Sequence, residues 1–141
     1  MLCFRGDNHG FKEWSMEKKL ENDLRLMEEL NHNYQLITKL VLIAKRKGFP
    51  LIIENPYSSQ HFLTRYWALK PSVIDYDRRD RGDFYEKPTQ YWFVNREPSN
   101  NFIFESSMPK ETKRVSHARN QVERSMISPD YANRFIREFI L

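Results

Sequence analysis

The sequence is poor in the residues that build covalent or metal-bound frameworks. Cys3 is the only cysteine among 141 residues, which excludes an intrachain disulfide, a zinc site built on paired cysteines and a cysteine-bound iron–sulfur cluster. The four histidines show no spacing typical of metal ligands, so surface or capping roles suit them better. The four glycines are too far apart to form a loop that cradles a phosphate or a cofactor; they are Gly6, Gly10, Gly48 and Gly82.

Long hydrophobic runs and a strong charge excess are absent as well. No stretch approaches the roughly 20 apolar residues that cross a bilayer, and Asp7 stands where a secretion signal needs an apolar run. We therefore expect a soluble, cytoplasmic protein with no membrane partner. Lys and Arg number 23 against 19 Asp and Glu, a net charge of +4 that does not by itself establish a nucleic-acid partner.

The sequence is rich in aromatic side chains, which can build a core despite 30% charged residues. It contains 10 Phe, 7 Tyr and 3 Trp, and 40% of all residues are hydrophobic. This composition and length predict one α/β domain over residues 15–141, preceded by a loop over residues 1–14. Residues 108–126 are polar and lack periodicity, so we expect an irregular basic segment there, with a short helix over 117–124 as the alternative.

The clearest expected element is a long amphipathic helix over residues 15–47. Ser15 can cap its first turn, and Gly48 can end it in the left-handed conformation. Asn31-His32-Asn33 is the place where the helix could break. Apolar residues recur at three- and four-residue steps: Leu20, Leu24, Met27, Leu30, Tyr34, Ile37, Val41 and Ala44.

The remaining pattern predicts a short sheet with helices packed on it. We expect strands over 50–54, 72–74, 89–94 and 101–105, and helices over 60–69 and 129–140. Ser58 or Ser59 can cap the first of these helices, and Ser128 the second. In a doubly wound sheet the strand at 51–54 would be central, and its missing neighbours imply an open edge that favours a homodimer.

Glu54 and Asn55 follow a buried strand, and ligands of open α/β sheets gather outside the carboxyl ends of strands. A carboxylate there could protonate or hydrogen-bond a ring nitrogen of a base. The alternative is an ordinary Asn-Pro turn after a strand, since Pro56 holds Asn55 in an extended conformation.

Several ordered motifs resemble the later part of DNA cytosine-5 methyltransferases, particularly the phage type. They are Ile53-Glu54-Asn55-Pro56, the arginines from Arg78 to Gly82 before Lys87-Pro88-Thr89, and Arg124 to Pro129 before a final helix. The resemblance covers roughly residues 35–141. It implies that Glu54 and Asn55 are base-contacting positions, and that the fold is a truncated Rossmann-like methyltransferase half-fold.

The chain departs from that family where the chemistry needs it most. Cytosine-5 methylation uses a thiolate from a Pro-Cys motif and a glycine-rich turn for S-adenosylmethionine. Leu2, not proline, precedes Cys3, and no glycine-rich turn is present. We therefore expect no catalytic residue and no cofactor in the isolated chain, with S-adenosylmethionine required only if another chain completes the fold.

Two basic stretches are candidate nucleic-acid contacts. Arg78, Arg79 and Arg81 stand among four acids, so they form either a solvated loop of internal ion pairs or forks that bind phosphate, with Lys87 nearby and Tyr76 or Phe84 free to stack on bases. The most basic stretch either follows a nucleic-acid backbone or is simply solvated; its candidates are Lys110, Lys113, Arg114 and Arg119.

Three functions follow from these observations. The first is a catalytically incomplete methyltransferase-like domain of phage or mobile-element origin that binds RNA or DNA. The second is a counter-defence inhibitor or adaptor that binds a host restriction enzyme, an RNA-guided CRISPR nuclease or its guide RNA. The third is one part of an active methyltransferase completed by another chain. The resemblance to phage proteins implies the cytoplasm of a bacterial host for all three.

Overall fold

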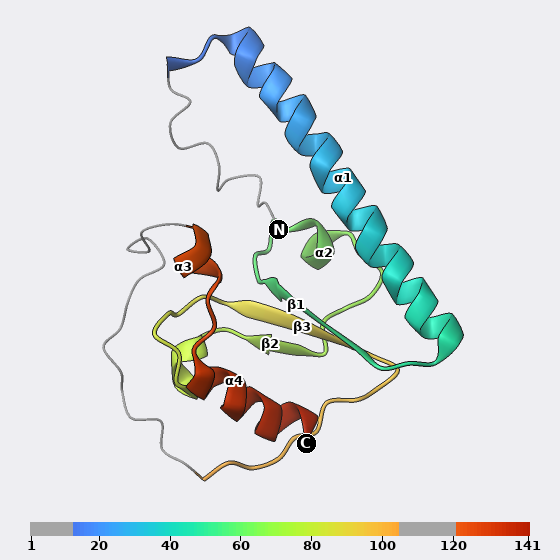
Figure 1. Ribbon diagram of the computed structural model, residues 1–141, viewed down its shortest axis with the longest axis vertical. Coiled ribbons are helices and arrows are strands. Elements are labelled where there is room, and N and C mark those ends of the chain that lie inside the picture. The colour runs from blue at the N-terminus through green and yellow to red at the C-terminus, as the bar shows by residue number, and fades with distance from the viewer. Residues whose placement is uncertain (1–12, 105–120) are drawn as a thin grey trace. The chain divides into compact units, whose positions relative to one another are not determined.

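The computed structural model describes residues 13–104 and 121–141 (Figure 1). The chain divides into two compact units, Met1–Phe49 and Pro50–Leu141. The expected loop over residues 1–14 and the expected irregular segment over 108–126 lie largely outside the described residues. Among the described residues, no helix combines the length and the apolar character that crossing a membrane requires.

The first unit contains helix α1, Met16–Lys47, as the sequence predicts. The Ser15 side chain accepts a hydrogen bond from the Lys18 backbone N–H at 3.2 Å, which satisfies one of the free donors of the first turn. Gly48 closes the helix at φ 76°, a left-handed conformation in which its N–H donates to the Ala44 carbonyl. The helix runs without interruption through residues 31–33, so the possible break there is not observed.

The second unit is built on a three-stranded sheet in the order β1-β3-β2, so the coarse prediction of an α/β fold is confirmed. The strands are β1 (Leu51–Pro56), β2 (Val73–Asp75) and β3 (Thr89–Val94). Both pairings are antiparallel, so β1 and β2 run in the same direction on either side of β3. A doubly wound sheet would have the strand at 51–54 at its centre, and the observed strand order differs from that arrangement. All six residues of β3 are buried, and this aromatic strand takes the centre while β1 lies at an edge.

The two faces of β3 are covered differently. Tyr91 and Phe93 pack against Tyr131, Phe135 and Phe139. These three rings come from α4 (Pro129–Phe135) and the π-helical turn η4 that follows it (Ile136–Ile140). Neighbouring residues of a strand point to opposite faces, so the Trp92 ring lies on the other side of the sheet.

On that second face Trp92 meets the segment that follows β1. Its ring centroid lies 5.5 Å from that of Trp67, and its indole N–H donates to the Leu69 carbonyl at 3.1 Å. This burial explains why α2 (Phe62–Arg65) is shorter than the expected helix over 60–69, because the chain leaves the helical path to bring Trp67 and Leu69 to the sheet. His61, not Ser58 or Ser59, caps α2 by accepting from the Leu63 N–H.

The remaining elements complete the comparison. Residues 101–104 are not a strand; the backbone N–H groups of Ser99 and Asn101 donate instead to carbonyls of Phe139 and Glu138. Glu105, the last residue of that expected strand, lies outside the described residues. The charged loop between β2 and β3, residues 76–88, carries the three arginines and contains a short 3-10 helix, η2 (Arg78–Arg81). A short helix, α3, occupies Gln121–Ser125.

Candidate functional site

One end of the sheet brings together three segments that the sequence singles out. Pro56 of β1 and Asp75 of β2 both pair with Thr89 of β3, so β1 and β2 end where β3 begins. The Glu-Asn-Pro residues, the start of the arginine loop and Lys87 therefore meet at this end. In open α/β sheets ligands bind outside the carboxyl ends of the strands, and β1 and β2 both have their carboxyl ends here, so we take this sheet end as the candidate site.

Glu54 and Asn55 point to opposite faces of the sheet. Glu54 lies opposite Tyr91 in the register and is exposed, whereas Asn55 lies opposite Gln90 and is buried. Gln90 stiffens the strand end, because its side-chain amide donates to the Pro56 carbonyl at 3.1 Å and to the Thr64 hydroxyl at 2.8 Å. Of the expected base-contacting pair, Glu54 is the residue that reaches the surface.

An aromatic pair flanks this strand end. The rings of Tyr57 and Tyr76 meet edge to face, with centroids 5.6 Å apart and planes at 84°. The Tyr57 backbone N–H donates to the Pro88 carbonyl at 2.9 Å, which ties the residue after β1 to the residue before β3. Tyr57 is half-buried and Tyr76 is 63% exposed, so the pair combines a supported ring with one open to solvent. Lys87 is half-buried, and its carbonyl accepts from the Thr89 hydroxyl.

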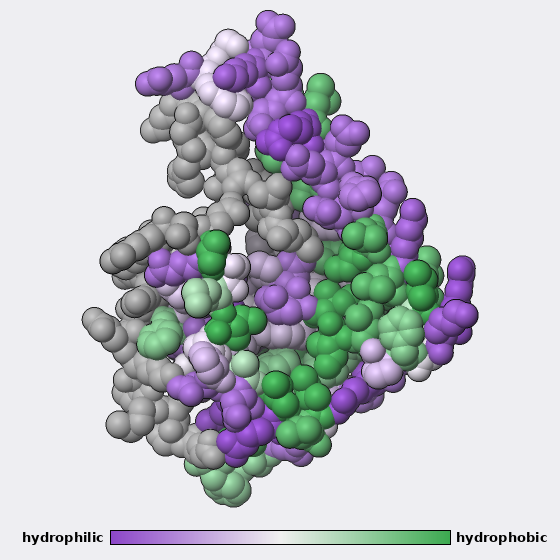
Figure 2. All heavy atoms as spheres, in the orientation of Figure 1, coloured by the Kyte–Doolittle hydropathy of each residue, from purple (hydrophilic) through white to green (hydrophobic). Residues whose placement is uncertain are grey.

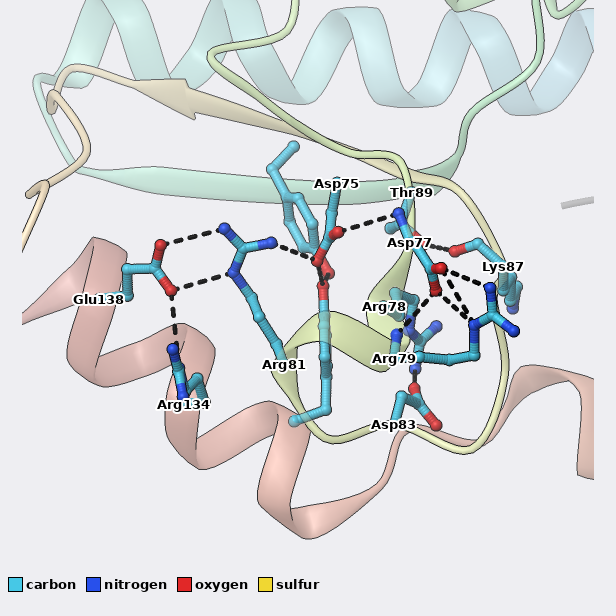
Figure 3. Close-up of polar contacts among 12 residues, drawn as sticks. Asp75, Asp77, Arg78, Arg79, Arg81, Asp83, Lys87, Thr89, Arg134 and Glu138 are labelled. Carbon is cyan, nitrogen blue, oxygen red and sulfur yellow. Dashed lines mark hydrogen bonds and ion pairs between the residues drawn. The ribbon is translucent and has the colours of Figure 1, made fainter. Parts of the chain in front are cut away.

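The arginines of the charged loop are engaged in internal ion pairs (Figure 3). Arg78 is fully buried and pairs with the equally buried Asp83. Its guanidinium lies 4.6 Å from the centre of the Tyr131 ring and donates to the Met126 carbonyl at 3.4 Å. Among the described residues no hydrogen-bond acceptor meets its Nε or Nη1, and the Tyr131 ring beside the guanidinium supplies a cation–π contact.

Arg81 joins the sheet to the last helix. Its Nη1 lies 3.1 Å from Asp75, and its Nε and Nη2 each donate to Glu138 at 3.0 Å. Arg134 lies 4.0 Å from the same Glu138 carboxylate. Burial alone would lower the pKa of Arg81, but its hydrogen bonds to Glu138 and the charge of Asp75 outweigh that effect and raise it. The fork geometry that could grip a phosphate is used inside the protein.

Arg79 is the most exposed of the three arginines. Its guanidinium makes several hydrogen bonds to Asp77 and lies 3.8 Å from Glu86. Those hydrogen bonds from Arg79 hold the pKa of Asp77 below its usual range. All three arginines of the loop are therefore paired with acidic side chains of the protein, as in the internal ion-pair interpretation.

The hydroxyls of Tyr91 and Tyr131 form a hydrogen-bonded series that ends on the Asp75 carboxylate at the end of β2. The Tyr131 hydroxyl donates to Asp75 at 3.0 Å, so its 2.8 Å contact with Tyr91 is one in which Tyr91 donates. Burial raises the pKa of Tyr91 to about 12 and that of Tyr131 further, so both hydroxyls stay protonated and act as donors. These two hydroxyls hold the Asp75 carboxylate in place, and because they stay protonated they act as donors rather than as nucleophiles. Sequence reasoning missed this series because Tyr131 comes from a helix 56 residues away from Asp75 along the chain.

The four remaining predicted contacts, Lys110, Lys113, Arg114 and Arg119, lie outside the described residues. Within residues 13–104 and 121–141, no cluster of three or more His, Cys, Asp or Glu side chains could hold a metal ion. Comparisons of the chain with protein-family models, curated proteins and solved structures found no match.

Proposed function

We propose that this chain is a nucleic-acid-binding domain related to DNA methyltransferases that does not transfer methyl groups by itself. The ordered Glu-Asn-Pro, arginine-loop and Ser-Pro motifs support the relationship, and the missing Pro-Cys and glycine-rich motifs support the lack of catalysis. The finer proposal is a truncated Rossmann-like half-fold. β1 and β2 run in the same direction, but β3 lies between them and pairs antiparallel with both, so this finer proposal is supported by the order of the motifs in the sequence.

The exposed Tyr76 ring at the sheet end is the observation that carries the proposal. Every base has a flat face that can stack on an aromatic ring, so an exposed tyrosine suits an unpaired strand better than a duplex. Tyr57 supports that ring from the side, and Glu54 offers hydrogen-bond acceptors on the same strand end. The proposed ligand is therefore single-stranded RNA or DNA.

In this proposal the phosphate contacts come from the basic stretch at 110–124 rather than from the arginines of the charged loop. Arg78 and Arg81 already bind carboxylates inside the protein. The sequence from 110 to 124 holds five basic and two acidic residues, a net charge of +3. Cations that neutralise phosphates release counterions, so the proposed binding weakens as salt rises.

Titration of labelled oligonucleotides tests the proposal. Single-stranded RNA, single-stranded DNA and a duplex of equal length are compared at low and physiological salt. We expect the single strands to bind best and Tyr76→Ala to weaken that binding about 5- to 150-fold, the usual range for one lost stacking contact. Phe102→Ala is the matched control, because Phe102 is another exposed ring, 79% exposed, that meets Phe104 edge to face and lies outside the three strands.

Two outcomes would contradict this proposal. Wild-type protein that binds none of the three oligonucleotides would argue for a protein target, such as a host defence complex. Equal losses for Tyr76→Ala and Phe102→Ala would show that the sheet end has no special role.

A further inference from the structure

Helix α1 carries two exposed apolar stripes that share one spacing. Leu20, Leu24 and Met27 are 55%, 68% and 54% exposed. Leu36, Leu40 and Ile43 repeat the same steps of four and three residues and are 61%, 41% and 48% exposed. Figure 2 shows hydrophobic side chains gathered along the last turns of this helix. Within each stripe the residues stand one turn apart, so each forms a continuous apolar surface.

The two stripes face nearly opposite directions. Each residue of the second stripe follows its counterpart in the first by 16 positions. At 3.6 residues per turn, that separation rotates a side chain by about 160°. A pair of helices related by a two-fold axis meets along one side of each helix, so such a pair cannot bury both stripes at once.

The charges beside the two stripes are opposite. Residues 16–31 contain five acidic and three basic residues, a net charge of −2. Among the basic ones, Arg25 is already bound to Glu29 at 2.5 Å. Residues 32–47 contain four basic residues and no acidic ones, a net charge of +4. Each half of α1 therefore carries the charge that the other half attracts.

We propose that the first stripe of one chain packs against the second stripe of another copy. The contact joins two different surfaces, and it buries apolar side chains whose flanking charges are complementary. A second copy fits both stripes. An anionic lipid surface would suit the basic half and repel the acidic one, and a nucleic acid offers no apolar surface for the leucines.

In a pair built in this way, one chain still has a free first stripe and the other chain still has a free second stripe. Association therefore continues beyond a dimer as the concentration rises, and it weakens at high salt because the flanking charges are screened. This differs from the closed homodimer that the open sheet edge suggests.

Mixing two variants of the full-length chain tests the proposal by sedimentation velocity. Leu24→Glu destroys the first stripe, and Leu40→Glu destroys the second. We expect wild-type protein to form species larger than a dimer and each variant alone to be monomeric. An equimolar mixture of the two variants should form a one-to-one dimer that grows no further, because one intact stripe of each kind remains. Leu42→Glu, at an exposed position outside both stripes, should associate like wild type.

Three outcomes would overturn the proposal. Wild-type protein that stays monomeric at micromolar concentrations would do so, as would a variant mixture that remains monomeric while circular dichroism shows both variants helical. Loss of association in Leu42→Glu would also overturn it, because a general loss of solubility or folding would then explain the other variants.

Discussion

Arg78 shows how the surroundings of a residue decide what its charge does. The sequence places it in a group of arginines that could bind phosphate, yet its guanidinium is enclosed by Asp83, the Tyr131 ring and the Met126 carbonyl. Taking both charges out of water is costly, and their pairing in this low-dielectric setting offsets that cost. The Arg78 guanidinium, paired with Asp83 in its own loop, joins η2 to Met126, in the segment that leads into α4, and to Tyr131 of α4.

Removing one member of this pair should destabilise the fold strongly. Asp83→Ala leaves the buried Arg78 cation without its carboxylate, and we expect a loss of about 3–5 kcal/mol in the free energy of unfolding measured in urea. Arg79→Ala is the control, because it removes an arginine of the same loop whose ion pair is open to solvent; its urea midpoint should barely move. Similar losses in the two variants would contradict the burial argument.

Residue types alone could not separate these roles. Arg78, Arg79 and Arg81 are nearly adjacent in the sequence, and what distinguishes them is their partners, of which Met126, Tyr131 and Glu138 lie beyond residue 125. A strand that ends near Glu54 could be predicted, because apolar strand residues and Asn55-Pro56 mark it locally, although β1 continues through Pro56, so Glu54 and Asn55 lie within the strand rather than after it. The Tyr57–Tyr76 contact could not, since it depends on how β1 and β2 flank β3.

Elements with strong local signals were predicted well. Helix α1 has caps and periodicity that agree, and β3 was predicted at its observed bounds because its aromatic run suits a buried strand. Helix α2 was not, because its four residues are fixed by long-range packing of Trp67 against Trp92 rather than by helix signals. Its cap, His61, is a residue that propensity does not favour at that position.

The cap of α2 should make the stability of the second unit depend on pH. Burial lowers the pKa of His61 from its usual 6.5, so the folded chain binds its proton less readily than the unfolded chain. Protonation then favours unfolding, and the stabilisation that is present at neutral pH declines as the pH falls through about 6.5. His61→Asn keeps a side-chain acceptor for the Leu63 N–H and removes the titration. We expect the variant to lose less stability than wild type between about pH 7.5 and 5, measured by urea unfolding. Parallel pH profiles would contradict this account.

At the scale of the whole molecule, the second unit contains its own core. All three strands, α4 and the rings of the cluster around Tyr91 lie between Pro50 and Leu141. We therefore expect residues 50–141, expressed alone, to fold with the sheet and its α4 cover intact, as judged by dispersed amide resonances and near-ultraviolet circular dichroism. A fragment that lacks fixed tertiary signals would show that this unit requires the first one.

The overall division of the chain was harder to predict than its elements. The sequence predicts a single domain over 15–141, whereas the structure has two compact units, with the boundary along the chain between Phe49 and Pro50. The amphipathic pattern of α1 indicates a helix with an apolar side but does not say what that side contacts. The order of the strands was equally hard to predict, because only the pairing of distant segments reveals that β3 lies between β1 and β2.

The cover of β3 on one face comes late in the order of synthesis. Tyr91 and Phe93 leave the ribosome about 40 residues before Tyr131, Phe135 and Phe139, the rings that bury them. Until the last of these emerges, the nascent chain carries an aromatic sheet face with nothing to pack on it, a typical target for chaperones and for aggregation. Translation that stops before residue 131 should therefore yield a sheet with one bare face, so the second unit completes its fold only after residues 131–139 have been made.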